Sequence, residues 1–472
     1  MEIDSILCDE LIQEIFRRLP PSSFSAVCLV SRRWVRLFRS STAALSLQLN
    51  NPIDLPRLFS FLSQHSFLFS LSISTTTPSA TAAVSSDRLL NSIALSCPNL
   101  RELRFLNDPV SPFSLFSLST SCPQLCSLSI TLSRPVELNW VARLRFLKDL
   151  SIFITGSSLE FSSPEFNYNQ LPEIYRAGLN LESLCLSGCR GSDYGLNWLW
   201  KNCNNLKKLK LKSCDGVGDN SSFSSFIKKC RGLQEVELRT CRTIIDGVLM
   251  KIAENSISLN SLLVYDGGSK EGLLQFISNN KCQLQKLDLR LPLDLDNDHL
   301  IAIGENFRFL SSLRLQSCCL VTGEGLKSLV RAMNDDNNLD ELALINCDVI
   351  EREPGLLSTL GQNLKRLRKL DLSYNETLLD KELISILGSC NNLIELKLRG
   401  CRRLTNAATV CVSRSCKKLQ ILDLMFCSKI ESEAIELFLL NSTDLKRLVI
   451  EQSKISAAAE ILASNKSIEI VV

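Results

Sequence analysis

A nine-residue phrase recurs along most of this chain of 472 residues. It carries leucine or a similar apolar residue at its first, fourth and sixth positions and often a cysteine at its ninth, as in the segment Leu206–Cys214. Between Leu181 and Leu445 the phrase takes ten steps, with a mean period of 26.4 residues. One copy cannot bury its own apolar face, so the copies are predicted to stack around one continuous core.

Each copy is predicted to form a short strand, a turn and a covering helix. Positions four and six point to the same side of a strand, because side chains alternate along it. The cysteine at position nine, replaced by Asn375 in one copy, is small enough to lie in the turn and bond to the backbone there. This pattern is typical of a leucine-rich-repeat solenoid. We therefore predict an α/β solenoid of about sixteen repeats, with a curved parallel sheet on its concave face and helices on its convex face.

The copies near the N-terminus are less regular. Irregular repeats are predicted over residues 41–155, an inserted surface loop over 156–178, and regular repeats over 179–472 with a final cap strand at Ile468–Val472. The Ser/Thr/Ala-rich segment Ser74–Ser86 is predicted to be a flexible loop. The first two strands are aligned 24 residues apart, with Ala44, Leu47 and Leu49 matching Leu68, Leu71 and Ile73.

Composition limits the classes of partner and the compartment. The net charge of +3 gives no case for nucleic acid as a main partner. Many of the 20 cysteines lie in the phrase or just before it, so we expect them to stack in the core as small apolar side chains. No signal peptide is visible, and the most apolar stretch, Leu58–Ile73, is too short to span a membrane. We expect a reducing compartment: cytoplasm, nucleus or both.

The residue types that carry catalysis are scarce. The two histidines, His65 and His299, have no recognisable Ser/His/Asp or Cys/His setting, and His299 is expected to be structural or to lie on the surface. The pairs Cys122–Cys126 and Cys185–Cys189 do not have the spacing of a zinc site. We therefore expect a chain that is not an enzyme and needs neither a metal nor a cofactor.

Residues 5–40 do not fit the repeat and predict three short helices. The first spans Cys8–Arg18 and is ended by Pro20 and Pro21. The second, which Ser22 and Ser23 can cap, carries Phe24, Val27 and Leu29, and the third runs from Ser31 to Phe38. So small a core seldom folds alone, so this segment is expected to complete its core against another protein.

The pattern of this segment resembles the F-box motif. It is carried by Leu7, Asp9, Glu10, Leu11, Ile15, Phe16, Leu19, Pro20, Phe24, Val30, Ser31, Arg32, Arg33 and Trp34. The family usually has proline where this chain has Cys8. Together with cysteine-type repeats, the chain is similar to F-box/leucine-rich-repeat proteins, especially the cysteine-containing plant-like kind.

This resemblance implies a substrate receptor of an SCF-type ubiquitin ligase. In that family the F-box docks on a Skp-type adaptor, which connects it to a cullin and a RING subunit, and the repeats capture a protein substrate. The residues expected to serve the adaptor interface are Leu7, Leu11, Ile15, Leu19, Pro20 and Trp34. Since the core is so small, these side chains are expected both to hold the helices together and to meet the partner.

The concave face is the second candidate surface. The residues that could bind substrate there are Lys208, Lys210, Lys212, Arg239, Tyr265, Arg290 and Arg399. They suggest a patch for an acidic or phosphorylated segment. The alternative is a solvated face of alternating charge, because Glu235, Glu237, Asp288 and Asp371 fall in the same sheet. A less polar region with Ile345, Ile421, Met425 and Val449 is an equal candidate.

Two other functions remain open. One is a small-molecule co-receptor, which a pocket lined by residues 156–178 or by the turn Tyr265–Gly268 would favour. The other is an interaction scaffold that binds the adaptor without promoting ubiquitination.

Overall fold

The computed structural model describes residues 7–19, 23–49, 54–75, 82–156, 178–193, 195–217, 221–291, 294–333 and 339–472. The chain forms two compact units, which we call unit 1 (Met1–Cys230) and unit 2 (Arg231–Val472). Most of the predicted inserted loop, residues 157–177, lies outside the described residues.

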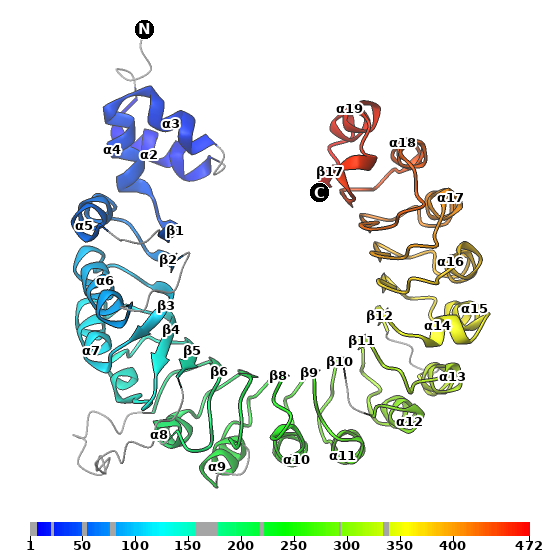
Figure 1. The fold of residues 1–472 in the computed structure, drawn as a ribbon, viewed down its shortest axis with the longest axis horizontal. Helices are drawn as coiled ribbons and strands as arrows, with labels where there is room; N and C mark the ends of the chain where they lie inside the picture. Colours follow the sequence, from blue (N-terminus) through cyan, green and yellow to red (C-terminus); the bar gives the residue numbers. More distant parts are fainter. Residues whose placement is uncertain are drawn as a thin grey trace. The chain divides into compact units, whose positions relative to one another are not determined.

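Unit 1 begins with helices and continues as a parallel sheet (Figure 1). The leading helices are α2 (Asp9–Arg18), α3 (Phe24–Val30) and α4 (Arg32–Ser41). The strands are β1 (Ala44–Leu49), β2 (Ser70–Thr75), β3 (Glu102–Val110), β4 (Ser127–Ser133), β5 (Asp149–Thr155), β6 (Ser183–Ser187) and β7 (Lys208–Lys212). Between or after them come α5 (Leu55–Ser63), α6 (Ala82–Ser96), α7 (Pro112–Ser121), the 3₁₀ helix η2 (Asn139–Arg143), α8 (Gly195–Asn202) and α9 (Ser221–Lys229). Each strand from β1 to β6 pairs in parallel with the next.

Unit 2 repeats the same strand–helix alternation. Its strands are β8 (Glu235–Arg239), β9 (Ser261–Tyr265), β10 (Lys286–Arg290), β11 (Ser312–Gln316), β12 (Glu341–Ile345), β13 (Lys369–Asp371), β14 (Glu395–Lys397), β15 (Ile421–Asp423), β16 (Arg447–Val449) and β17 (Glu469–Val471). Its helices are α10 (Ile245–Asn255), α11 (Lys270–Asn279), α12 (Asn297–Asn306), α13 (Gly323–Ala332), α14 (Val349–Arg352), α15 (Leu356–Asn363), α16 (Asp380–Leu387), α17 (Asn406–Ser415), α18 (Ser432–Asn441), η6 (Gln452–Lys454) and α19 (Ala457–Asn465). Each strand from β8 to β16 again pairs in parallel with the next.

The fold class predicted from the repeat is therefore confirmed. In each unit the strands lie on one side and the α-helices that connect them on the other (Figure 1). The leucines at positions four and six of the phrase face the helices. In β7, Leu209 and Leu211 are completely buried, and they lie beside Leu184 and Leu186 of β6. Burying one such leucine contributes roughly 1.5–3 kcal/mol, so the ladder of equivalent leucines is the main source of stability.

The ninth position of the phrase bonds to the backbone, as the sequence predicts. The Cys427 thiol donates to the carbonyl oxygen of Leu398, in the preceding repeat, over 3.0 Å. Asn375 does more in the same slot, because its amide nitrogen donates to the Leu344 carbonyl oxygen (2.8 Å) and its amide oxygen accepts from the Cys347 backbone N–H (2.9 Å). This slot therefore joins each repeat to its neighbour.

Two predictions in the irregular part are wrong. In the first strand Leu47, not Leu49, lies beside Ile73, so β1 and β2 are offset by 26 residues rather than 24. The predicted loop Ser74–Ser86 is also too long, because α6 already begins at Ala82; residues 76–81 lie outside the described part. Ser86 is buried in α6, where packing overrides a composition that favours loops.

Candidate functional site

The three N-terminal helices share a small apolar core. Its buried side chains are Ile12, Phe16, Val27 and Leu37. The rings of Trp34 and Phe38 meet the Phe16 ring edge-on, with centroids 5.2 Å and 5.9 Å away. Edge-on aromatic pairs add about 0.5–1.5 kcal/mol to the free energy gained from burial alone. Trp34 is therefore mainly a core residue of this bundle.

Polar residues of the same segment fix how the helices meet. The Arg33 guanidinium forms an ion pair of 2.6 Å with Asp9 at the start of α2 and donates to the Leu7 carbonyl oxygen over 3.0 Å. The Ser31 hydroxyl caps α4 by accepting from the Trp34 backbone N–H over 3.1 Å. These bonds tie the first turn of α4 to the first turn of α2.

Helix α2 has a second apolar face that the bundle does not cover. Ile12 and Phe16 are 1% and 3% exposed, whereas Leu11 and Ile15 are 54% and 45% exposed. Of the other residues predicted for the adaptor interface, Leu7, Leu19 and Trp34 are half-buried against the core, and Pro20 lies outside the described residues. The structure thus places Leu11 and Ile15 within reach of a partner.

Sequence reasoning missed two apolar residues at the end of α3. The sequence placed Leu29 on the same helix as Val27 without assigning it to a surface, and in the structure Leu29 is 86% exposed and Val30 is exposed as well. Residues two apart on a helix do not face the same side, so Val27 and Leu29 could not both point inward. The spacing of two residues could therefore have shown from the sequence that Leu29 is exposed.

The predicted basic residues of unit 1 lie together on one strand. Lys208, Lys210 and Lys212 alternate with the buried Leu209 and Leu211 along β7, so they share the sheet face opposite the helices. Lys208 is exposed, and Lys210 and Lys212 are partly buried.

The basic residues predicted in unit 2 are paired with acids. Arg290 and Asp288 lie 2.6 Å apart on β10, and Arg399 on the turn after β14 reaches Asp423 on β15 over 3.0 Å. The hydrogen bonds that Arg290 donates to the Asp288 carboxylate raise the pKa of Arg290. Arg239 likewise pairs with Glu237, and Arg314 bridges Asp288 and Asp371. Tyr265 is partly buried beside them. This arrangement favours the alternating-charge face over a continuous anion site.

The less polar region offers less apolar surface than the sequence suggests. Ile345 and Met425 are buried, and Ile421 and Val449 are only partly exposed. The exposed apolar area lies one position further on, where the Tyr374 and Phe426 rings are about half exposed. Sequence reasoning did not single out these two aromatic residues.

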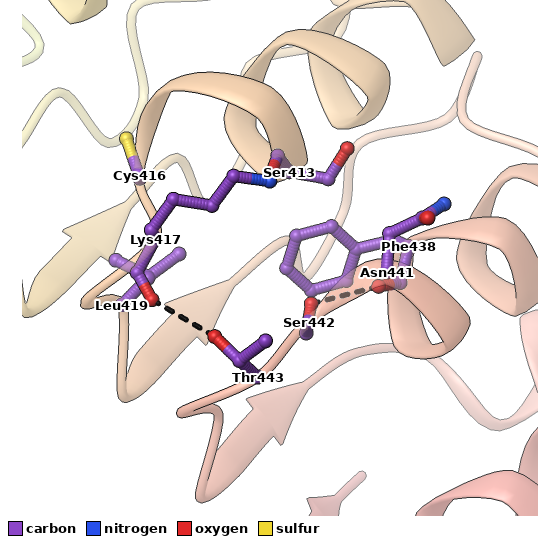
Figure 2. Close-up of a pocket in the computed structure, with 8 residues that line it drawn as sticks. All are labelled: Ser413, Cys416, Lys417, Leu419, Phe438, Asn441, Ser442 and Thr443. Atoms are coloured by element: carbon purple, nitrogen blue, oxygen red, sulfur yellow. Dashed lines mark hydrogen bonds between the residues drawn. The ribbon is translucent and has the colours of Figure 1, made fainter.

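The described residues give no support to a small-molecule pocket at Tyr265–Gly268. Asp266 is held by Arg242 over 2.7 Å, and the backbone of Gly267 packs so closely that a Cβ there would lie 2.7 Å from Ile245. Figure 2 shows a hollow lined by the ends of α17 and α18, with hydrogen bonds from Thr443 to the Lys417 backbone and from Ser442 to the Phe438 backbone. Its cavity volume is about 10 Å³. Ligand pockets usually measure about 300–1,000 Å³, so this hollow is small for one.

The structure assigns the histidines to structural roles. Nδ1 of His299 is 2.8 Å from Asp296 at the start of α12, and its Nε2 is 2.9 Å from the Lys270 carbonyl oxygen. Burial raises the pKa of Asp296, but hydrogen bonds from Lys270 and His299 outweigh it and lower that pKa to about 2. His65 is buried, with Nδ1 2.9 Å from the Phe61 carbonyl oxygen.

Within the described ranges, no three His, Cys, Asp or Glu side chains are grouped so that they could hold a metal ion. Over the same residues, no helix combines the length and apolar character needed to cross a membrane. None of the described cysteines forms a disulfide. Burial raises the pKa of Cys97 and Cys230 to about 11, so these thiols are poor nucleophiles.

Comparison with known families supports the two parts separately. The F-box domain family matches residues 5–42, and the Leucine Rich repeat family matches residues 308–330. The chain therefore contains an F-box domain and leucine-rich repeats. Its similarity to the cysteine-containing plant-like kind stays a prediction.

Curated relatives with the same two parts match a limited segment. F-box/LRR-repeat protein 4 of Bos taurus is 28% identical over 216 residues, which are 45% of this chain and 34% of that protein. The F-box/LRR-repeat MAX2 homolog of Oryza sativa subsp. japonica is 29% identical over 217 residues, or 38% of this chain and 29% of that protein. The chain spans about a third of the length of these relatives.

Solved structures are similar only at low identity. The Rad7 and Elc1 complex of yeast matches with a TM-score of 0.40 and 15% identity, over 98% of this chain and 92% of that one. The leucine-rich repeat-containing protein LegL7 of Legionella pneumophila matches with a TM-score of 0.38 and 15% identity, over 61% of this chain and 90% of that one.

Proposed function

We propose that this chain, which joins an F-box domain to leucine-rich repeats, is the substrate-recognition subunit of an SCF-type ubiquitin ligase. The F-box docks on a Skp-type adaptor, and the adaptor connects the chain to a cullin and a RING subunit. The repeats hold the protein substrate. One observation carries the proposal: within a segment that matches the F-box domain, α2 buries Ile12 and Phe16 but leaves Leu11 and Ile15 half-exposed.

The energetics of this second face support docking. A fully buried Leu or Ile contributes roughly 1.5–3 kcal/mol relative to an exposed one. Leu11 and Ile15 are about half-covered in the free chain, so a partner that covers the rest gains roughly 1.5–3 kcal/mol from them. Exposed apolar side chains grouped on one helix face are typical of a protein interface.

The proposed mechanism is proximity. A substrate held on the repeats meets the ubiquitin-conjugating enzyme at a high effective concentration, so the transfer becomes effectively intramolecular. The chain itself supplies no reacting group in this mechanism, which is why we propose a non-catalytic role.

Co-purification with the adaptor tests the proposal. We expect the wild-type chain to bring down both adaptor and cullin, and the Leu11→Ala/Ile15→Ala variant to lose both while its circular dichroism is unchanged. Leu437→Ala/Ile384→Ala is the matched control, because Leu437 and Ile384 are 54% and 42% exposed and lie on helices of the repeats. Trp34→Ala is less suitable, since its ring packs against Phe16.

Two results would contradict the proposal. Adaptor binding that survives in the Leu11→Ala/Ile15→Ala variant would place the interface elsewhere. A folded wild-type chain that binds no adaptor would reduce the N-terminal helices to a cap on the solenoid. Adaptor binding without cullin would instead favour the scaffold alternative.

We propose the nucleus, the cytoplasm or both as the location. The many buried thiols support this, because such cysteines persist in reducing compartments. Fluorescence imaging of a tagged chain tests the assignment, and a signal in the secretory pathway would contradict it.

A further inference from the structure

Two aromatic residues in unit 2 occupy a backbone position that rarely holds them. Tyr374, Gly400 and Phe426 follow β13, β14 and β15 at equal intervals, and their φ angles are 61°, 71° and 63°. This left-handed conformation suits Gly, Asn and Asp and is uncommon for bulky side chains. Asn346 holds the same slot after β12 with a φ of 48°. The slot is also left-handed in earlier repeats, at Thr240, Leu291 and Ser317, so the turn of the repeat imposes this conformation. What distinguishes Tyr374 and Phe426 is that the turn holds an exposed aromatic ring at this position.

Gly400 and Arg399, which lie on the turn between those of Tyr374 and Phe426, help to position the two rings. A Cβ at Gly400 would lie 2.8 Å from Cδ1 of Tyr374, so the absent side chain lets that ring lie over the neighbouring turn. The Arg399 guanidinium carbon is 5.8 Å from the Phe426 ring centroid, and its Nε is 3.0 Å from Asp423. The ion pair and the cation–π contact together fix the Arg399 side chain beside the ring.

The same edge carries cations that the sheet does not neutralise. Arg402, Arg403 and Lys429 are exposed in the turns after β14 and β15. Arg402 is 3.5 Å from Glu376, whereas Arg403 and Lys429 form no ion pair with any residue in the described part of the chain. This differs from the strands themselves, where Arg290 pairs with an acid. We call Tyr374, Arg399, Arg402, Arg403, Phe426 and Lys429 the exit edge.

We propose that the exit edge binds an acidic segment of the protein substrate that also carries a large apolar side chain. This inference rests on the proposed function. Aromatic residues and arginine supply most of the binding free energy at protein interfaces, and the cations select carboxylates through charge-assisted hydrogen bonds. Nucleic acid fits less well, because phosphate recognition needs a longer row of cations and the chain as a whole carries only +3.

Selection from a random short-peptide display library, with the full chain as bait, tests the proposal. We expect peptides rich in Asp and Glu with at least one aromatic or large aliphatic residue. The selected peptides should bind at least about tenfold more weakly to Arg403→Gln/Lys429→Gln and to Phe426→Asn. Asparagine is chosen because Asn346 already occupies the equivalent left-handed slot, so the variant is expected to fold.

Matched controls remove the same side-chain types elsewhere in unit 2. Lys365→Gln/Arg414→Gln deletes two exposed cations from the turn before β13 and from α17, and Phe309→Asn removes an exposed ring before β11. Both should bind the peptides as tightly as the wild type. Peptides without acidic residues, peptides that bind the exit-edge variants equally well, or no enriched peptide would each overturn the proposal. Binding of a single-stranded RNA probe to these residues, together with no binding of acidic peptides, would also overturn the proposal.

Adaptor co-purification on the same preparations separates the two proposals. The exit-edge variants should retain the adaptor, and Leu11→Ala/Ile15→Ala should retain the peptides. If peptide binding fails while adaptor binding stands, only the exit-edge proposal falls. If adaptor binding fails while peptide binding stands, the ligase role falls and the exit edge remains a peptide site.

Discussion

The N-terminal helices and the repeats differ in how completely they bury apolar residues that lie close together in the sequence. In β7, Leu209 and Leu211 are both completely buried, because an adjacent strand and helices cover them. In α2, Ile12 is buried but its neighbour Leu11 is 54% exposed. A repeat always has another repeat to cover its apolar face, whereas three short helices have no second layer. The difference indicates which apolar residues stabilise the chain and which are available to a partner.

The cysteines follow the same division. Cys8 and Cys28 of the N-terminal helices are exposed, while those at the ninth position of the phrase, such as Cys214 and Cys427, are buried. In the repeats a cysteine joins neighbouring turns, which the helices do not need.

Removing one large core ring in each region should lower the free energy of unfolding most. Trp200 packs against Phe223 and Phe226, with ring centroids 5.2 Å and 4.8 Å away. We expect Trp200→Ala to lower the free energy of unfolding of unit 1 by about 3–5 kcal/mol, measured by urea unfolding. Phe16→Ala should cost a similar free energy but release mainly α2–α4, because its contacts lie within those helices.

Hydrogen exchange separates the two outcomes. In Phe16→Ala, amides of α2–α4 should lose protection while those of β3–β7 keep it. Equal loss of protection across unit 1 would show that the helices and the repeats unfold as one body, and the division between the regions would fail.

A smaller effect is expected in the slot that joins the repeats. Asn375→Ala removes hydrogen bonds to the Leu344 carbonyl oxygen and the Cys347 backbone N–H, so it should cost about 1–3 kcal/mol in urea unfolding of unit 2. Asn375→Cys restores the residue found at this position in most copies and should recover part of that loss. If Asn375→Cys is no more stable than Asn375→Ala, the slot only needs a small side chain and the bonds contribute little.

The buried thiols predict an alkaline loss of stability in the repeats. Burial raises the pKa of Cys97, Cys230 and Cys390 from 9.0 to about 11 in the folded chain. Unfolded thiols ionise near pH 9, so the stabilisation is complete below that pH and is lost as the pH rises from 9 towards 11. Urea midpoints across this range should fall, and should fall equally in the Cys8→Ser/Cys28→Ser control.

Alkylation at pH 8 checks the same contrast in another way. Cys8 and Cys28 should react with iodoacetamide in the folded chain, and Cys97 and Cys230 only after unfolding. Mass spectrometry that found Cys97 modified as fast as Cys28 would contradict the assignment of the repeat cysteines to a closed core.

Most of the fold could be predicted because the phrase fixes several positions at once. Each strand from β6 onward lies where the phrase places it, and the bonding of the ninth residue follows from its small polar side chain. The first strand could not be aligned in the same way. Leu45, Leu47 and Leu49 alternate equally well in either register, so only contact with β2 decides between them.

The candidate site was less predictable because its residues depend on neighbours from other repeats. The pairing of Asp288 with Arg290 could be predicted from the sequence, because residues two apart on a strand share one face. The pairing of Arg399 with Asp423 requires the register of β14 against β15. The exposure of Tyr374 and Phe426 depends on a left-handed turn. A bulky residue gives no sign of this conformation in the sequence, because such residues rarely adopt it.

Substitutions on the exposed face of α2 should change the free energy of unfolding least. Because Leu11 and Ile15 are already about half-exposed, replacing each by alanine should lower the free energy of unfolding by only about 1 kcal/mol. Ile12→Ala, one residue away and 1% exposed, should instead cost about 2–5 kcal/mol. Urea unfolding of the N-terminal helices, followed by hydrogen exchange of their backbone amides, measures both. A loss in Leu11→Ala or in Ile15→Ala as large as that in Ile12→Ala would mean that the exposed face already stabilises the free chain, and that α2 has no surface reserved for a partner.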